Sequence, residues 1–435
     1  MRILLISKTY PMGAEASGTG AMAKVIAEGL VGWGHELQVL ASYRVPSGTY
    51  DGVAVRSGLI MDQPSPSKMP ADWTGWDKVL FIRKARHNYA AVRKAIQQYR
   101  PDVVYLNDIE MLTGAVFAAC GDAGARAIFH VHDHIVYDIV ARAAVVGRGP
   151  VPRQSAATPG GAQVPALQCQ MVQGKLKGPA QSGKQRLIGR LTHDRPVERF
   201  FAAPLIAVSR FIAERYIGLG WPRERVHVVH NGLPGYFFQG GPRQRSQDRR
   251  FRLLFVGRCV EDKGVNLLPE LMRRLVDRGV DAELALVGSF PGQAAQEAFM
   301  ARVEKMGLSG RIQHRGVGAR EELPAVYAEA DCVVVPSLCN EAFGLMSAEA
   351  QACGTPVVAF RAGGLSETLV EGATGFLCER GDVEGMAGYV ERLSREEGLW
   401  ERMSEVGARF AGERFGSEEK VERIEGMLAE MVRLQ

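Results

Sequence analysis

Two glutamates eight positions apart are the residues of this sequence best suited to hold a polar ligand. Glu341 stands just before a helix expected over 343–353, and Glu349 lies within it, so at ~1.5 Å rise per residue the two are about 10 Å apart. Between them, the amides of Gly344 and Leu345 point out of the helix N-terminus, where a diphosphate is stabilised. Because carboxylates repel an anion, the glutamates are expected to bind sugar hydroxyls. The arrangement suits a sugar nucleotide.

Glycines and histidines of the first half also suggest ligands. Gly18-Thr19-Gly20 resembles a dinucleotide-binding fingerprint, but it stands too far along the chain from the preceding strand for a dehydrogenase. We expect these glycines to begin a helix whose backbone amides can approach an anion. His130, His132 and His134 alternate, as metal ligands on one strand face can. We instead expect one of these histidines, at the carboxyl end of its strand, to contact the substrate. The GxxxxGK match at 178–185 lacks the hydroxyl and the strand of a phosphate-binding loop.

The elements that must position these residues follow a repeated pattern. Short runs rich in Val, Ile and Leu recur between stretches of helical periodicity, which predicts parallel strands buried on both faces. Ligands of such open α/β sheets bind at the carboxyl ends of the strands. The expected strands are 3–7, 37–41, 103–106, 127–131, 205–208 and 226–229 in the first half, and 253–256, 283–287, 312–315, 332–335 and 356–359 in the second.

The fold class is therefore α/β, with two Rossmann-like doubly wound domains over 1–238 and 251–415. The linker is expected at 239–250, QGGPRQRSQDRR, which has almost no apolar content. An irregular, Gly- and Pro-rich insert at about 147–184 is either a substrate-facing loop or disordered. Residues 416–435 form an amphipathic helix that we expect to pack back toward the N-terminal domain.

The 435 residues carry a net charge of +5, but residues 1–240 are net +11 and residues 241–435 are net −6. The basic half predicts an anionic partner, either the acceptor or a membrane surface. A basic amphipathic helix expected at 78–100 could lie on an anionic membrane, although a solvated helix face is the more ordinary interpretation. Seven cysteines without a CxxC pair predict neither disulfides nor zinc thiolates. We expect a cytoplasmic protein, with peripheral contact at the inner membrane face as an open alternative, and no nucleic acid partner.

The region around the glutamates resembles the signature of retaining glycosyltransferases of family GT4. The resemblance rests on E-A-F-G-x-x-x-x-E at 341–349, on A-x-x-x-G-T-P-V-V-A at 350–359, and on G-G-L-x-E at 363–367. A second block, Gly257-Arg258 followed by Lys263-Gly264, resembles the strand-end pair of the same family. The resemblance covers most of residues 1–415 and implies the GT-B fold, with two Rossmann-like domains facing an interdomain cleft.

The resemblance also implies roles for individual residues. Glu341 and His132 would contact the donor sugar, Glu349 the nucleotide ribose, and Arg258 and Lys263 the diphosphate. We therefore expect the catalytic set to be Glu341, His132, Arg258 and Lys263. The expected donor-binding set shares Glu341, Arg258 and Lys263 with the catalytic set. It further contains the glycine-rich helix starts, the strand-end glycine, the ribose glutamate and a glutamate that could contact the donor or cap a helix: Gly18, Thr19, Gly20, Gly257, Phe343, Gly344, Leu345, Glu349 and Glu367.

The implied activity is transfer of a sugar, with retention, from a UDP- or GDP-sugar to a hydroxyl acceptor in glycan or glycoconjugate synthesis. Attack occurs on the front face, the departing diphosphate helps to take the acceptor proton, and the two cations stabilise it, so no metal or other cofactor is required. The sequence departs from the family pattern at Pro234, where the family commonly has an acidic residue, and at the insert. The acceptor therefore stays unassigned. Two alternatives stay open: a silent scaffold that binds nucleotide sugars, and a GT-B sugar-nucleotide epimerase.

Overall fold

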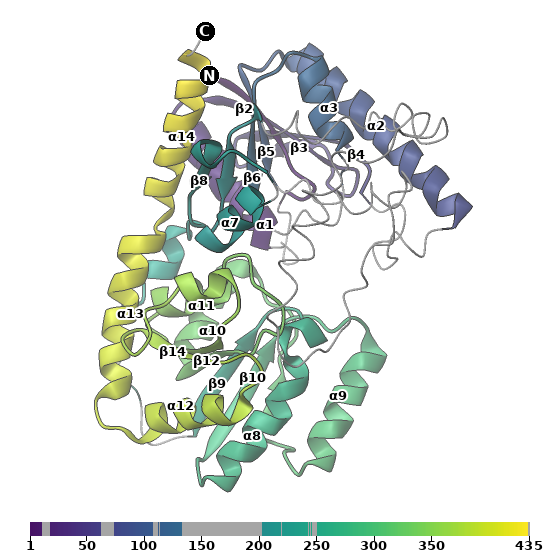
Figure 1. Ribbon diagram of the computed structural model, residues 1–435. Coiled ribbons are helices and arrows are strands. Elements are labelled where there is room, and N and C mark those ends of the chain that lie inside the picture. Colours follow the sequence, from purple (N-terminus) through teal and green to yellow (C-terminus); the bar gives the residue numbers. More distant parts are fainter. Residues whose placement is uncertain are drawn as a thin grey trace. The chain divides into compact units, whose positions relative to one another are not determined.

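Two largely parallel sheets organise the computed structural model (Figure 1). One compact unit contains residues up to Val229 together with the chain from Val421 onward, and the other extends from His230 to Lys420. The residues that the structure describes are 1–10, 18–61, 74–107, 112, 114–132, 202–218, 220–241, 243, 245 and 250–433.

The first unit contains an eight-stranded sheet in the order β3-β4-β2-β1-β5-β6-β7-β8, in which only β3 and β4 pair antiparallel. The strand order reverses between β1 and β5, the point at which doubly wound sheets bind ligands. The elements described in this unit are β1 (Arg2–Ile6), α1 (Gly18–Gly32), β2 (Glu36–Ser42), β3 (Gly48–Tyr50), β4 (Val53–Leu59), α2 (Gly75–Tyr99), β5 (Val103–Asn107), α3 (Ala115–Asp122), β6 (Ala127–Val131), β7 (Leu205–Ala207), α7 (Arg210–Gly218) and β8 (Val226–Val228).

The second unit contains a six-stranded parallel sheet in the order β11-β10-β9-β12-β13-β14. Here the order reverses between β9 and β12, which places a second switch point at their carboxyl ends. The helices and strands of this unit are β9 (Phe251–Val256), α8 (Leu268–Asp277), β10 (Ala282–Val287), α9 (Gln293–Lys305), β11 (Ile312–His314), α10 (Leu323–Glu329), β12 (Cys332–Val335), α11 (Leu345–Ala352), β13 (Val357–Phe360), β14 (Gly375–Cys378), α12 (Val383–Arg395) and α13 (Leu399–Phe415), and α14 (Ser417–Arg433) begins in it.

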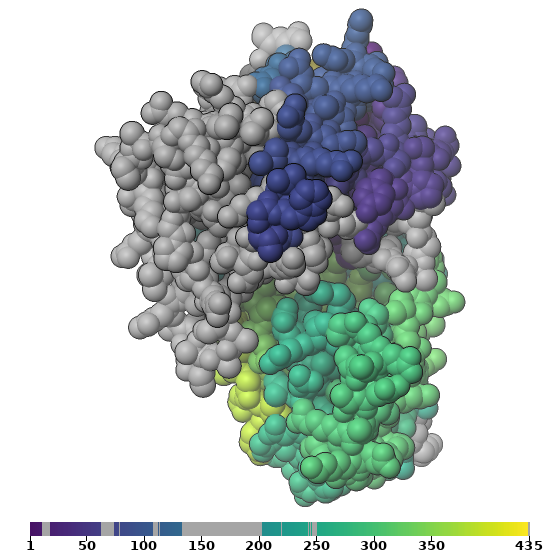
Figure 2. Space-filling view, turned by 90° about the vertical axis from the view of Figure 1, so that its right-hand side faces the viewer, coloured from purple at the N-terminus to yellow at the C-terminus, as the bar shows by residue number. Residues whose placement is uncertain are grey.

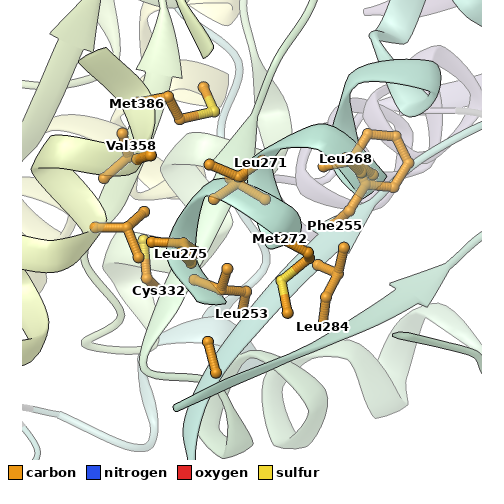
Figure 3. Close-up of a cluster of buried hydrophobic side chains, with 14 of the residues drawn as sticks. Leu253, Phe255, Leu268, Leu271, Met272, Leu275, Leu284, Cys332, Val358 and Met386 are labelled. Carbon is orange, nitrogen blue, oxygen red and sulfur yellow. The ribbon is translucent and has the colours of Figure 1, made fainter. Parts of the chain in front are cut away.

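The core of the second unit forms where α8 and α12 cover one face of this sheet. Figure 3 shows Leu271 and Leu275 of α8 with Leu253 of β9, Val358 of β13 and Met386 of α12 in one buried cluster. Each of these five side chains is at most 1% exposed. Such burial on both faces explains why the strands appear in the sequence as continuous apolar runs. The packed sheet gives the loops at its carboxyl edge a rigid base.

Three strands were not expected from the sequence. β3 and β4 pair near an edge of the first sheet, where β4 alternates buried and more exposed residues and so lacks a continuous apolar run. β14 is four residues long and begins with Gly375, a residue that disfavours strands on its own. Backbone pairing with β13 stabilises it. The expected helix at 343–353 is α11, which begins two residues later and ends one residue earlier.

Residues 230–238, which the sequence assigned to the first domain, make their contacts in the second unit. Phe237 is fully buried, its ring lies 6.3 Å from that of Tyr327, and its carbonyl oxygen accepts from the Cys353 thiol. The sequence assigned this segment to the first domain because it is apolar and precedes the polar linker. Its packing partners lie far along the sequence, so local composition does not identify them. The unit boundary therefore falls at Val229.

The two amphipathic helices expected from the sequence both form. α2 begins with a capping box, in which the Thr74 hydroxyl accepts from the Asp77 amide and the Asp77 carboxylate accepts from the Thr74 amide. In α14, Val421, Ile424 and Leu428 are buried in the core of the first unit. The insert at 147–184, the GxxxxGK match at 178–185 and His134 lie outside the described residues.

Candidate functional site

A partly buried ion pair occupies the switch point of the second unit. The Lys263 ammonium lies 2.7 Å from both carboxylate oxygens of Glu341, and the Ser337 hydroxyl donates to Oε1 of the same carboxylate at 2.5 Å. The side chains of Lys263 and Glu341 are 18% and 9% exposed. Charge-assisted hydrogen bonds from two groups fix the orientation of the Glu341 carboxylate. Its remaining lone pairs can accept from a ligand hydroxyl.

The loops that carry this pair are bonded to each other. The Asp262 carbonyl oxygen accepts from the amides of Leu338 and Cys339, at 2.8 and 3.0 Å. Gly264 follows with φ +73°, and a Cβ there would stand 1.8 Å from the carbonyl oxygen of Pro336. Only glycine permits this approach and this backbone conformation. Gly264 therefore lets the backbone come close enough to the loop after β12 for the Lys263 side chain to reach that loop.

The loop after β12 leads into the start of α11. Glu341 bonds through its amide to the Ala362 carbonyl and through its carbonyl to the Gly364 amide, which attaches it to the turn Gly364–Glu367 after β13. Gly344 caps α11 with φ +100°, and a Cβ there would meet the Leu365 side chain at 2.5 Å. Among the described residues, no acceptor is bonded to the amides of Gly344, Leu345 and Met346. The helix start thus presents N–H groups beside Glu341.

Glu349 lies on α11 and is 3% exposed. Its Oε1 accepts from the Arg320 guanidinium, and its Oε2 accepts from the Tyr327 hydroxyl at 2.8 Å. Burial acts to lower the pKa of Arg320, but the Glu349 carboxylate together with Tyr236 and Tyr327 raises that pKa on balance. Burial and then Glu349 raise the pKa of Tyr327 well above its usual value. Glu349 is therefore the centre of a buried polar cluster, in which each of its carboxylate oxygens accepts from a protein donor.

The other residues expected in this unit lie around the same edge of the sheet. Arg258 follows β9 and is exposed, and its guanidinium makes no hydrogen bond or ion pair with a described residue. Gly257 has φ +142°, and its carbonyl oxygen stands 1.8 Å from where a Cβ on Gly288 would lie. Glu367 is 3.4 Å from His230 Nε2, and the His230 ring packs on Phe343 at 5.5 Å. The structure thus joins Lys263 to Glu341 directly and leaves Arg258 unpaired.

The residues expected in the first half belong to the first unit. Gly18-Thr19-Gly20 form the start of α1, as the sequence predicted. His132 follows β6, is 7% exposed, and places Nε2 at 2.8 Å from Asn107 Oδ1. His130 bonds instead to the Tyr105 hydroxyl. Within the described part of the chain, no three His, Cys, Asp or Glu side chains are grouped as metal ligands.

Sequence reasoning missed three residues that touch the expected site residues. Ser337 bonds to Glu341, Arg320 to Glu349 and Asn107 to His132. Ser337 and Asn107 had a detectable signal, since each stands at the carboxyl end of an expected strand. Arg320 had none, because it is one of many arginines in a polar segment and only the tertiary fold brings it to α11.

Family models match both halves of the chain. The model described as glycosyl transferases group 1 matches residues 242–410, and the model described as glycosyl transferase 4-like domain matches residues 17–232. A D-inositol 3-phosphate glycosyltransferase of Mycobacterium sp. (strain KMS) is 34% identical over 198 residues, 43% of this chain and 44% of that protein. One of Paenarthrobacter aurescens (strain TC1) is 33% identical over 226 residues, 49% and 54% of the two chains. The matches thus span about half the length of these relatives.

Solved structures resemble the whole chain in fold. The Anabaena protein HepE in complex with UDP and glucose aligns with a TM-score of 0.66 and 19% identity over 98% of this chain and 99% of that chain. Sucrose-phosphate synthase from Thermosynechococcus elongatus aligns with a TM-score of 0.69 and 18% identity over the full length of both chains. The sheet orders and these likenesses confirm the expected GT-B architecture of two Rossmann-like domains. The chain belongs to the group 1 glycosyltransferases, family GT4, with a glycosyl transferase 4-like first domain.

Proposed function

We propose that this chain is a retaining glycosyltransferase that moves a sugar from a nucleoside diphosphate donor to a hydroxyl acceptor without a metal ion. The observation that carries the proposal is the contact of Lys263 with Glu341 beside the N-terminus of α11, at the switch point of the second sheet. A cation, a fixed carboxylate and unbonded helix amides are the groups that a sugar diphosphate needs. Their placement at a strand-end loop is typical of ligand sites in open α/β sheets.

In this mechanism Glu341 accepts a hydrogen bond from a donor hydroxyl, and Lys263 turns toward the diphosphate. Negative charge grows on the diphosphate as the bond to the sugar breaks. Lys263, Arg258 and the amides at Gly344 and Leu345 stabilise that charge, and they do so more strongly in the transition state than in the bound donor. Arg258 is suited to this task because its guanidinium is exposed and has no described protein partner.

Glu349 is assigned to the nucleotide ribose and His132 to the donor sugar, as the family resemblance implies. No side chain is assigned as a nucleophile. Attack of the acceptor on the same face as the departing diphosphate gives retention, and a diphosphate oxygen takes the acceptor proton. Glu367 and Phe343 support the loop beside Glu341, and Gly18-Thr19-Gly20 supply amides at the start of α1.

The donor is proposed to be a UDP-sugar, with a GDP-sugar as the alternative. The support for UDP is that the Anabaena HepE structures contain UDP, UDP-glucose, or UDP and glucose. The test is a thermal-shift screen of UDP-, GDP- and ADP-sugars in EDTA, followed by measurement of released nucleoside diphosphate. A donor at a hundredfold its Kd stabilises by ~2.7 kcal/mol. Transfer that persists in EDTA with retained anomeric configuration is the expected result.

The same screen separates the two alternatives. A scaffold binds the donor and leaves it intact in the presence of every acceptor extract. An epimerase converts the donor to another sugar or to free nucleotide when no acceptor is added. Either result would contradict the transferase proposal.

The acceptor is proposed to carry negative charge, because residues 1–240 are net +11. The D-inositol 3-phosphate glycosyltransferases among the relatives are named for an anionic polyol, so phosphorylated polyols belong in the acceptor screen. Glycolipids in anionic vesicles form the second acceptor class. The site for this acceptor is expected in the first unit.

One face of α2 in the first unit suits contact with an anionic membrane. Trp76 and Val79 at its start are 69% and 50% exposed, and Arg83 and Arg86 follow on the same face at helical spacing. The guanidinium groups of these two arginines make no ion pair or hydrogen bond with a described residue. Figure 2 shows this part of α2, in dark blue, open on the surface. An exposed tryptophan beside unpaired cations is typical of helices that lie in the membrane interface. Among the described helices, none is long and apolar enough to span a bilayer.

Reversing both arginines, Arg83→Glu with Arg86→Glu, is expected to reduce the partition of the protein onto phosphatidylserine-containing vesicles by about tenfold or more at low salt. Each cation near such a surface contributes ~1 kcal/mol. The measurement is vesicle sedimentation. The matched control is Lys305→Glu with Arg409→Glu, which changes the net charge equally on exposed positions of the second unit. Equal partition of the two double variants, or none of the wild type, would remove the membrane contact.

A further inference from the structure

A chain of hydrogen bonds crosses the carboxyl ends of three neighbouring strands in the first unit. Ser7 follows β1, Asn107 ends β5 and His132 follows β6, and these strands are adjacent in the sheet. The Ser7 hydroxyl donates to the Thr9 carbonyl at 2.6 Å, Asn107 Nδ2 donates to Ser7 Oγ at 3.4 Å, and His132 Nε2 is 2.8 Å from Asn107 Oδ1. Ser7 and Asn107 are fully buried, and His132 is 7% exposed.

The Thr9 backbone carbonyl fixes the donor-to-acceptor direction of this series of hydrogen bonds. Because the Thr9 carbonyl can only accept, the Ser7 proton points toward it, and Ser7 Oγ presents its lone pairs to Asn107. The Asn107 amide nitrogen therefore faces Ser7, and its oxygen faces His132. That oxygen can only accept, so His132 Nε2 carries a proton. In the neutral ring, Nδ1 then holds a lone pair.

A second imidazole lies against His132 and stays uncharged. The rings of His130 and His132 are 4.0 Å apart, and His130 Nδ1 is 2.7 Å from the Tyr105 hydroxyl. Burial, and then the neighbouring His132, lower the pKa of His130 well below its usual value. The neutral ring of His130 thus packs against His132. Asn107, and not His130, determines which nitrogen of His132 carries the proton.

We propose that Asn107 is a positioning residue that holds His132 as the Nε2–H tautomer, so that Nδ1 is presented as a hydrogen-bond acceptor for a hydroxyl of the donor sugar. The role toward the sugar rests on the function proposed above, whereas the tautomer does not. A histidine in the other tautomer would present an N–H at that position and would favour a ligand acceptor instead. Asn107 therefore decides whether a sugar hydroxyl donates its hydrogen bond to His132 or accepts one from it.

The tautomer is measured directly by nitrogen NMR of the full chain with 15N-labelled imidazoles, with His132→Gln used to assign the His132 signals. We expect the wild type to show a protonated Nε2 and an unprotonated Nδ1. Asn107→Leu removes the acceptor and is expected to give a mixture of tautomers. Asn107→Asp keeps an acceptor and is expected to keep Nε2–H. Tyr105→Phe is the matched control, since it removes a buried hydroxyl from His130 only and leaves the His132 tautomer unchanged.

Ser7→Ala provides a second route should Asn107→Leu fail to fold. It frees the Asn107 amide to turn, so a partial shift toward Nδ1–H is expected. A wild-type His132 with Nδ1–H, or a tautomer unchanged in both Asn107→Leu and Ser7→Ala, would overturn the proposal.

Kinetics separate this inference from the proposed function. In the transferase, Asn107→Leu is expected to lower kcat by about tenfold, the effect of one misplaced hydrogen bond, and leave the acceptor KM unchanged. Asn107→Asp should restore most of the rate, which a merely structural role would not require. If the wild type transfers no sugar while His132 shows Nε2–H, the proposed function fails and the positioning role stands. If transfer is active and Asn107→Leu changes neither kcat nor the tautomer, the positioning role fails.

Discussion

Lys263→Met is expected to reduce kcat/KM for sugar transfer by at least about a hundredfold. The variant removes the cation placed to stabilise the departing diphosphate, and loss of a single donor to a developing anion costs ~10²–10³ in rate. It also leaves the Glu341 carboxylate, 9% exposed, with Ser337 as its protein donor. The measurement is release of nucleoside diphosphate at saturating acceptor, with donor binding followed by calorimetry. A wild-type rate in Lys263→Met would remove this lysine from the mechanism.

Two further variants separate the contribution of Lys263 from that of Glu341. Lys305→Met on α9 is the matched control, because this lysine is exposed and lies in the same unit, and its activity should be unchanged. Glu341→Gln keeps the size of the side chain but weakens its hydrogen bond to a sugar hydroxyl. We expect Glu341→Gln to bind UDP normally and UDP-sugar weakly, whereas Lys263→Met should weaken both. If both variants weaken UDP alone, the assignment of Glu341 to the sugar is wrong.

Arg320→Met is expected to give the largest loss of stability, about 3 kcal/mol or more in the free energy of unfolding. Breaking a buried ion pair leaves an uncompensated charge, and such changes cost about 3–5 kcal/mol. Arg320 is 15% exposed, its guanidinium lies 5.6 Å from the Phe237 ring, and its partner Glu349 is 3% exposed. Urea unfolding of the full chain gives the measurement. Arg315→Met is the matched control, since its pair with Glu329 is solvent-exposed and should cost about 1 kcal/mol or less.

A double variant tests whether the loss comes from the unpaired charge. Arg320→Met with Glu349→Leu removes both charges, and we expect it to recover much of the stability lost by Arg320→Met alone. Sugar transfer should not recover, because Glu349 is assigned to the ribose. If the double variant is as unstable as the single variant, the cost arises from packing on Phe237 and not from Glu349.

The sequence alone predicted the sheet strands that are buried on both faces, since each is a continuous apolar run such as Cys332–Val335. It did not predict β4, whose residues alternate, or β14, whose short run begins with glycine. It also assigned residues 230–238 to the wrong unit, because the burial of Phe237 depends on Tyr327, ninety positions away. Local patterns report local burial, and they do not identify the partner.

The same division holds at the site. The spacing of Glu341 and Glu349, the glycines before α11 and the family motifs predicted which residues would face a strand-end ligand, because helix geometry and strand order are local properties. Only the tertiary structure decided the partners: Lys263 on Glu341 and Arg320 on Glu349. These contacts join segments 29 to 78 positions apart. A hydrogen bond depends on tenths of an ångström between such segments, and that distance is set by packing of the whole sheet.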